Sequence, residues 1–143
     1  MQQATPRRSM SGQSVVVTLF FSIGLYLLTR TAMAQAAQVT PLLSKDLPES
    51  PGKEVLMITV KKAPGGADPI HRHNVHGFIY VLEGSLVMQV EGGKEVTLTP
   101  GQTFYESPSD VHTVGRNASS TKPVKFLVVL VKDKGAPVLV PVK

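Results

Sequence analysis

The 143-residue sequence predicts an all-β protein, a single small barrel or sandwich domain that follows an N-terminal export signal. From residue 54 onward the chain is a series of short apolar or alternating runs rich in Val, Leu, Phe, Tyr and Thr. Turn signals built from Gly, Pro, Asp and Ser separate these runs, and no helical period of ten or more residues is evident among them. Short runs with frequent turns are typical of a closed or two-layered β fold.

Residues 1–34 are expected to be a signal peptide. Arg7 and Arg8 precede the apolar run 15–28, VVVTLFFSIGLYLL, and the small residues Ala32 and Ala34 follow it. A charged start, an apolar run and an A-x-A site predict cleavage near Ala34 and an exported protein, periplasmic or secreted. The run is shorter than the roughly 20 residues that span a bilayer, so we expect membrane attachment only if the segment stays uncleaved as an anchor.

The charge of the expected mature chain argues against a nucleic-acid-binding function. The whole chain carries 15 basic and 10 acidic residues, but Arg7, Arg8 and Arg30 leave with the signal, so 12 − 10 = +2 remains. The pairs Lys61/Lys62 and Lys132/Lys134 are interpreted as solvated strand edges. The sequence contains no cysteine, so any metal would be bound by nitrogen and oxygen.

Residues 35–53, with three prolines and Gly52, are expected to form an extended lead-in, and residues 54–143 the barrel domain. The first expected strand, EVLMITVK, alternates in hydropathy and ends before the turn signal at 64–66. Turn signals at 83–84, 92–93, 100–101, 108–110 and 135 divide the rest. The expected strands are 54–61, 78–82, 85–91, 94–99, 103–106, 112–116, 124–132 and 138–142.

Three of the four histidines fall in the stretch IHRHNVHGF at 70–78, and the fourth is His112. Side chains alternate along a strand, so His71 and His73 would project from the same face about 7 Å apart. His112 opens a later expected strand and is the natural third ligand. A lone histidine would be taken for a surface residue, whereas this pattern favours a divalent metal site.

These residues resemble two motifs of the cupin superfamily. The first motif, G-x5-H-x-H-x3-E-x6-G, is matched by Gly65, His71, His73 and Gly84. The second, G-x5-P-x-G-x2-H-x3-N, is matched in part by Gly101, His112 and Asn117. The resemblance covers about residues 54–132. It implies a small β-barrel of the double-stranded β-helix or jelly-roll type, a divalent metal in its mouth, and frequently a homodimer.

The first motif is incomplete, because the position of the family's glutamate ligand is held by Gly77. Three arrangements are open. We favour a three-histidine site with free coordination positions, over one in which Glu106 arrives as fourth ligand or as a hydrogen-bond acceptor behind a histidine. The third arrangement uses His76, although strand parity points that side chain away from the site.

A neutral three-nitrogen site leaves a divalent ion its full charge, which favours an anionic or enolisable oxygen ligand. We therefore expect a small oxygenated compound as substrate or ligand, with iron, manganese, nickel or zinc as the metal. The expected activity is that of a metal-dependent dioxygenase, isomerase or lyase. The alternatives are a non-catalytic barrel with a degenerate site, which holds a small ligand or metal, and a structural barrel with incidental histidines.

Overall fold

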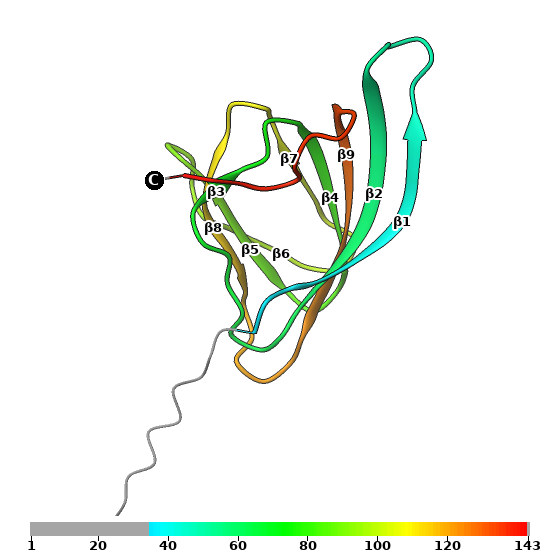
Figure 1. Cartoon of the computed structure of the whole chain (residues 1–143). Helices are drawn as coiled ribbons and strands as arrows, with labels where there is room; N and C mark the ends of the chain where they lie inside the picture. Colours follow the sequence, from blue (N-terminus) through cyan, green and yellow to red (C-terminus); the bar gives the residue numbers. More distant parts are fainter. Residues whose placement is uncertain (1–34, 143) are drawn as a thin grey trace, which may run out of the picture. The chain divides into compact units, whose positions relative to one another are not determined.

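The computed structural model describes residues 35–142, which form ten β-strands (Figure 1). The expected signal peptide and its cleavage site lie outside the described residues. Between residues 35 and 142 there is no helix long and apolar enough to cross a membrane. In chain order the strands are β1 (Gln38–Asp46), β2 (Lys53–Lys62), β3 (His71–Arg72), β4 (His76–Glu83), β5 (Leu86–Val90), β6 (Val96–Leu98), β7 (Thr103–Glu106), β8 (Val111–Asn117), β9 (Val124–Asp133) and β10 (Val140–Pro141).

The strands form two five-stranded antiparallel sheets, ordered β1-β2-β9-β4-β7 and β10-β3-β8-β5-β6. Within residues 35–142 the chain changes sheet at seven of the nine connections between consecutive strands, so neighbours in sequence usually lie in different sheets. In Figure 1 the two sheets wrap around a common interior. The prediction of an all-β barrel is confirmed, and each of the eight expected strands overlaps an observed one.

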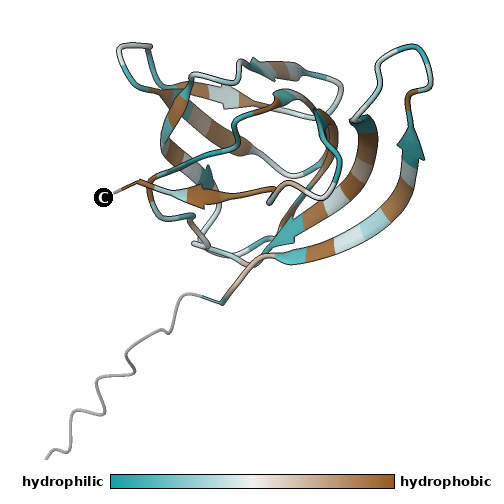
Figure 2. Cartoon of the chain, turned by 45° about the horizontal axis from the view of Figure 1, so that its top comes forward, coloured by the Kyte–Doolittle hydropathy of each residue, from teal (hydrophilic) through white to brown (hydrophobic). Residues whose placement is uncertain are grey.

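The core lies between the two sheets and follows from the period of two along each strand. In β9, every second residue from Val124 to Leu130 is buried, and β4 buries Ile79 and Val81 in the same manner. Leu86 and Met88 of β5 close the core from the other sheet. The alternation is visible as bands along the strands in Figure 2.

Two features differ from the expectation. Residues 38–46 lie in the expected lead-in but form β1, an edge strand paired with β2 along its length. Every residue of β1 is exposed, and Pro41 is next to an irregularity in its ladder, so the segment lacks the alternating pattern that reveals a strand. Also, β3 covers only two residues, so His73 follows the strand and does not belong to it.

The interpretation of two lysines as solvated was wrong. Lys62 is 2% exposed and Lys132 is 4% exposed, and both side chains lie on the inward faces of their strands. Each is paired with a carboxylate: Lys62 with Asp68, and Lys132 with Glu54. An inward lysine needs such a partner, because an unpaired buried charge is strongly unfavourable.

Candidate metal centre

Four side chains from different segments meet inside the barrel. His71 begins β3 and lies directly opposite His112 of β8 in the antiparallel ladder. His73 follows β3, and Glu106 is the last residue of β7. His71, Glu106 and His112 are almost completely buried, whereas the His73 side chain is 16% exposed. The structure thus brings together the three histidines that the sequence selected and one of the two additional candidates.

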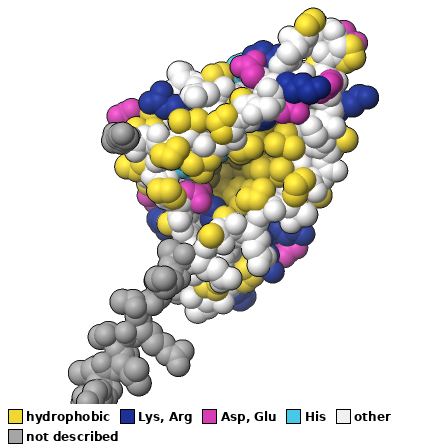
Figure 3. Space-filling model, viewed as in Figure 1, with side chains coloured by type: hydrophobic (Ala, Val, Ile, Leu, Met, Phe, Trp, Pro, Cys, Tyr) yellow, Lys and Arg dark blue, Asp and Glu magenta, His cyan; other side chains and the backbone are white. Residues whose placement is uncertain are grey.

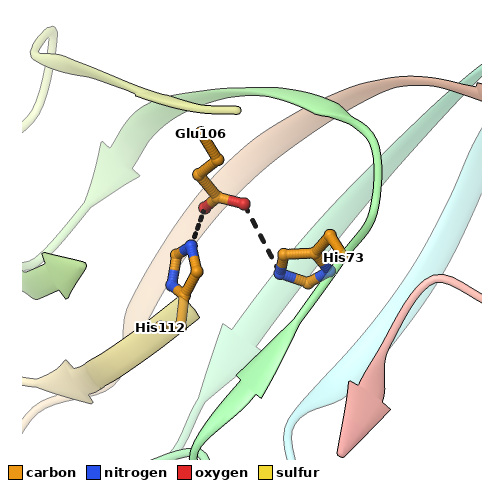
Figure 4. Close-up of side chains that lie close together, drawn as sticks. All are labelled: His73, Glu106 and His112. Atoms are coloured by element: carbon orange, nitrogen blue, oxygen red, sulfur yellow. Dashed lines mark ion pairs between the residues drawn. The ribbon is translucent and has the colours of Figure 1, made fainter. Parts of the chain in front are cut away.

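The ligand atoms of these residues face one another, and Figure 4 shows three of the four side chains, His73, Glu106 and His112. The His71 and His73 Nε2 atoms are 3.1 Å apart. Glu106 lies between the other two rings: its Oε2 is 3.4 Å from His73 Nε2, and its Oε1 is 3.2 Å from His112 Nε2. One ligand atom each from His73, Glu106 and His112 all lie within 4.8 Å of one another. The ring centroids of the three histidines are 4.7 to 5.3 Å apart.

The hydrogen bonds behind two rings decide which nitrogen carries the proton. His71 Nδ1 is 2.8 Å from the carbonyl oxygen of Pro69, and His73 Nδ1 contacts the carbonyl oxygen of Val138. A carbonyl oxygen can only accept, so each Nδ1 is the donor, and Nε2 is the ring nitrogen that faces the cluster. Burial lowers the pKa of His71, an effect that the Pro69 carbonyl opposes and the neighbouring imidazoles reinforce, so His71 favours this neutral form.

The cluster therefore brings several acceptor atoms close together. Two imidazole lone pairs face each other at 3.1 Å. Within the described residues, Glu106 Oε2 and His112 Nε2 are buried with no hydrogen-bond partner. Buried polar atoms are rarely left unpaired, and such orphans call for a specific explanation. A divalent cation at the centre would satisfy all four side chains at once, so the donor set fits a metal.

Glu106 occupies the space that Gly77 leaves free. The two residues are direct partners in the β4–β7 ladder. A Cβ atom added to Gly77 would lie 3.0 Å from Glu106 Oε2 and 3.4 Å from its Cβ and Cδ. Opposite residues in an antiparallel pair project from the same face of the sheet. A carboxylate from β7 therefore lies in the space where the resemblance would place one on β4.

His76 does not join the cluster. It is exposed, and its Nδ1 lies 2.7 Å from the Tyr105 hydroxyl group. Gly77, the next residue, is buried, so His76 projects from the opposite, outer face of β4. Strand parity alone had indicated this orientation.

A mostly apolar cavity of about 410 Å³ adjoins the cluster. Its walls include Leu56, Ile58 and Val60 of β2, together with Phe126 and Val128 of β9. His71, His73, Glu106 and Asp68 supply the ionisable groups of the lining. Figure 3 shows a hollow in this face of the molecule whose floor consists of apolar side chains. A volume in this range, with few polar groups, is typical of a small-molecule site.

Sequence reasoning missed two contributors to the site. The Val138 carbonyl, which orients His73, carries no side-chain signal and could not have been found. The Lys62–Asp68 pair could have been found, because Lys62 continues the inward series of Ile58 and Val60 at a spacing of two.

Residues 58–130, just over half of the chain, match the family model described as a cupin domain. This chain belongs to the cupin family. The match begins within β2 and ends within β9, and so includes all four side chains of the cluster. A search of curated protein sequences finds no match to this cupin.

Solved structures support the same fold. The cupin domain of an XRE family transcriptional regulator from Enterobacter cloacae is 30% identical, with a TM-score of 0.52, over 67% of this cupin and 96% of that chain. A Klebsiella pneumoniae protein with a double-stranded β-helix domain has a TM-score of 0.59 and 16% identity. The match covers 75% of this cupin and 84% of that chain. DMSP lyase from Ruegeria pomeroyi has a TM-score of 0.54 and 22% identity. The match covers 61% of this cupin but only 42% of that enzyme.

Proposed function

We propose that this cupin binds one divalent metal ion through His71, His73, His112 and Glu106. We further propose that it uses this centre to hold a small oxygenated compound in the adjoining cavity. The observation that carries the proposal is the convergence of three imidazole Nε2 atoms on a buried carboxylate whose Oε2 has no hydrogen-bond partner within residues 35–142. The donor set of nitrogen and oxygen suits iron, manganese, nickel or zinc.

Charge limits what the centre would accept. Three neutral imidazoles and one carboxylate would offset one of the two charges of a divalent ion, which leaves a net charge of about +1 in a buried site. An anionic or enolisable oxygen group on the ligand would balance that charge. A bound ion would supply Lewis-acid polarisation of such an oxygen.

The protein's own residues would orient the ligand and keep water away. The carbonyls of Pro69 and Val138 hold the rings of His71 and His73 in one orientation and one tautomer. The apolar walls from β2 and β9 favour a ligand with a largely apolar body. The partly exposed ring of His73 is the member of the cluster that is open to solvent.

We favour catalysis by a dioxygenase, isomerase or lyase over simple binding. The case for a degenerate, non-catalytic site is the missing glutamate at position 77, and Glu106 fills that space from the neighbouring strand. The similar folds do not decide the matter, since one is a DMSP lyase and another is a domain of a transcriptional regulator.

The test is metal analysis of the full-length chain and of two matched histidine variants. After incubation with each of the four metals and removal of excess ion, we expect about one ion per chain for at least one metal. His73→Ala should lose it, whereas His76→Ala, which removes an exposed histidine from the outer face of β4, should keep it. Absence of metal from the wild type, or equal content in both variants, would contradict the proposal.

A further inference from the structure

A buried ion pair that is not part of the histidine cluster lies beside the same cavity. Lys62, at the end of β2, is 2% exposed, and its Nζ donates to Asp68 Oδ2. The same ammonium group donates to the carbonyl oxygen of Gly115 at 2.7 Å and lies 5.8 Å from the ring centroid of Phe126. Two of the three N–H donors of the ammonium group thus bind protein acceptors inside the barrel, which fixes its position.

The fold makes room for this pair. A Cβ atom at Gly115 would lie 3.0 Å from Asp68 Oδ2 and 3.6 Å from Lys62 Nζ, so a side chain at that position would crowd both partners. The Gly115 carbonyl also accepts from the backbone N–H of Asp68 at 2.9 Å. The buried Asn117 amide donates to the carbonyl of Ala63 at 2.9 Å and so fixes the chain immediately after Lys62.

Asp68 differs from Lys62 because it reaches the cavity. Its side chain is 28% exposed and forms part of the cavity lining, together with His71, His73 and Glu106. Only its Oδ2 is engaged by Lys62, and no group of residues 35–142 donates to Oδ1. A buried ion pair adds little net stability compared with apolar residues of the same volume. A carboxylate that lines the cavity and keeps one oxygen without a donor is therefore better explained by contact with a ligand than by folding.

We propose that Asp68 is the second polar contact of the ligand, an acceptor for a hydroxyl group on its apolar body, with Lys62 as the residue that positions it. The inference rests on the proposed function, in which the other end of the ligand places an oxygen at the histidine cluster. Lys62 already balances the charge of Asp68, and its ammonium group would repel a second cation, so a neutral hydroxyl group fits better than an amine. The ligand class is an apolar, anionic or enolisable molecule with one distal hydroxyl group.

The test compares probes that differ by one hydroxyl group. Metal-loaded full-length chain is titrated by fluorescence with 2-naphthoate and with its analogues that carry a hydroxyl group on the distal ring. A hydrogen bond to a charged acceptor contributes roughly 1.5–3 kcal/mol, so at least one hydroxylated probe should bind about tenfold tighter than 2-naphthoate or better. In a variant without the Asp68 carboxylate this preference should vanish, so that 2-naphthoate and its hydroxylated analogues bind with similar affinity.

The variant must not leave a buried charge behind. Asp68→Ala alone would strand Lys62, so the double variant Lys62→Met/Asp68→Ala is used, which removes both charges. The matched control is Lys132→Met/Glu54→Gln, because that pair also joins a buried lysine to a carboxylate but lies at the opposite end of the β2–β9 ladder. The control should retain the preference for the hydroxylated probe.

Elemental analysis of every sample separates the two proposals. A metal-loaded wild type that binds none of the probes, or binds them all equally, contradicts this inference and leaves the metal centre standing. Survival of the hydroxyl preference in Lys62→Met/Asp68→Ala, or its loss in the control, also overturns the inference. A wild type that takes up no metal contradicts the proposed function, and this inference with it.

Discussion

Replacement of Glu106 by glutamine should raise the stability of the metal-free protein. In the described structure Glu106 Oε2 is buried without a donor, and the carboxylate lies 3.4 Å from His73 Nε2 and 3.2 Å from His112 Nε2. A glutamine side chain would bring an N–H donor to the lone pair of one of these two rings and remove a buried charge. An unsatisfied buried group costs about 1–3 kcal/mol, so Tm of metal-free Glu106→Gln should rise by about 4–12 °C at about 4 °C per kcal/mol.

The same change should weaken the effect of metal. At a metal concentration of 100 times Kd, binding stabilises the wild type by about 2.7 kcal/mol, or about 10 °C in Tm. If loss of the carboxylate weakens binding about a hundredfold, the same concentration stabilises the variant by only about 0.4 kcal/mol, which is about 2 °C. When metal is added, the difference in Tm between Glu106→Gln and the wild type should therefore become smaller or change sign.

The assay is thermal unfolding at pH 8, first with a chelator and then with zinc or manganese. Glu54→Gln is the matched control: its Oε1 is 2.5 Å from Nζ of the buried Lys132, so the same substitution there removes a real partner and should lower Tm. The rise in Tm that metal causes in Glu54→Gln should equal the rise in the wild type. A Glu106→Gln variant that is less stable than the wild type in chelator and keeps the full metal shift would refute this account of the site.

Three further outcomes are expected. Burial lowers the pKa of His71 below 6.5, so the unfolded chain binds more protons and the metal-free protein should lose stability in urea titrations as pH falls below about 6.5. The loss should be smaller in His71→Asn. A chain that ends at Ala136 lacks the Val138 carbonyl behind His73, and isothermal titration should show metal affinity reduced about 10–100-fold; wild-type affinity would contradict that role. We also propose export, so intact mass after expression in a bacterial host should give a mature chain that begins at Gln35, and an uncleaved mass would argue against a signal peptide.

The sequence predicted the strands in which buried residues recur at every second position or fill the whole strand. All eight expected strands appear in the structure, and most of them alternate or are uniformly apolar because one face packs against the core. His71, His73 and His112 could be selected because their residue types and spacing are unusual in a core. Spacing alone did not show that His73 leaves the strand after Arg72, although its ring still points to the cluster.

The sequence was uninformative where a segment's position depends on its partners. The strand β1 buries no residue, so no pattern marks it, and only its pairing with β2 makes it part of the sheet. The polar partners of the site depend on long-range approach: Val138 is 65 positions from His73, and Gly115 is 53 positions from Lys62. Contacts of this kind arise from the folded topology and leave no local trace.

The position of the carboxylate shows why an incomplete motif need not mean an incomplete site. In an antiparallel ladder the Cβ atoms of directly opposite residues are roughly 4.5–5.5 Å apart on the same face, so a carboxylate from either strand reaches the same space. Here Gly77 and Glu106 are such a pair, and the glycine is what allows the longer side chain to lie across β4. A motif that follows a single strand lacks its glutamate at position 77. The site, however, requires only that one member of the Gly77–Glu106 pair carries a carboxylate. The exchange Gly77→Glu/Glu106→Gly would therefore be expected to keep a carboxylate beside the three histidines.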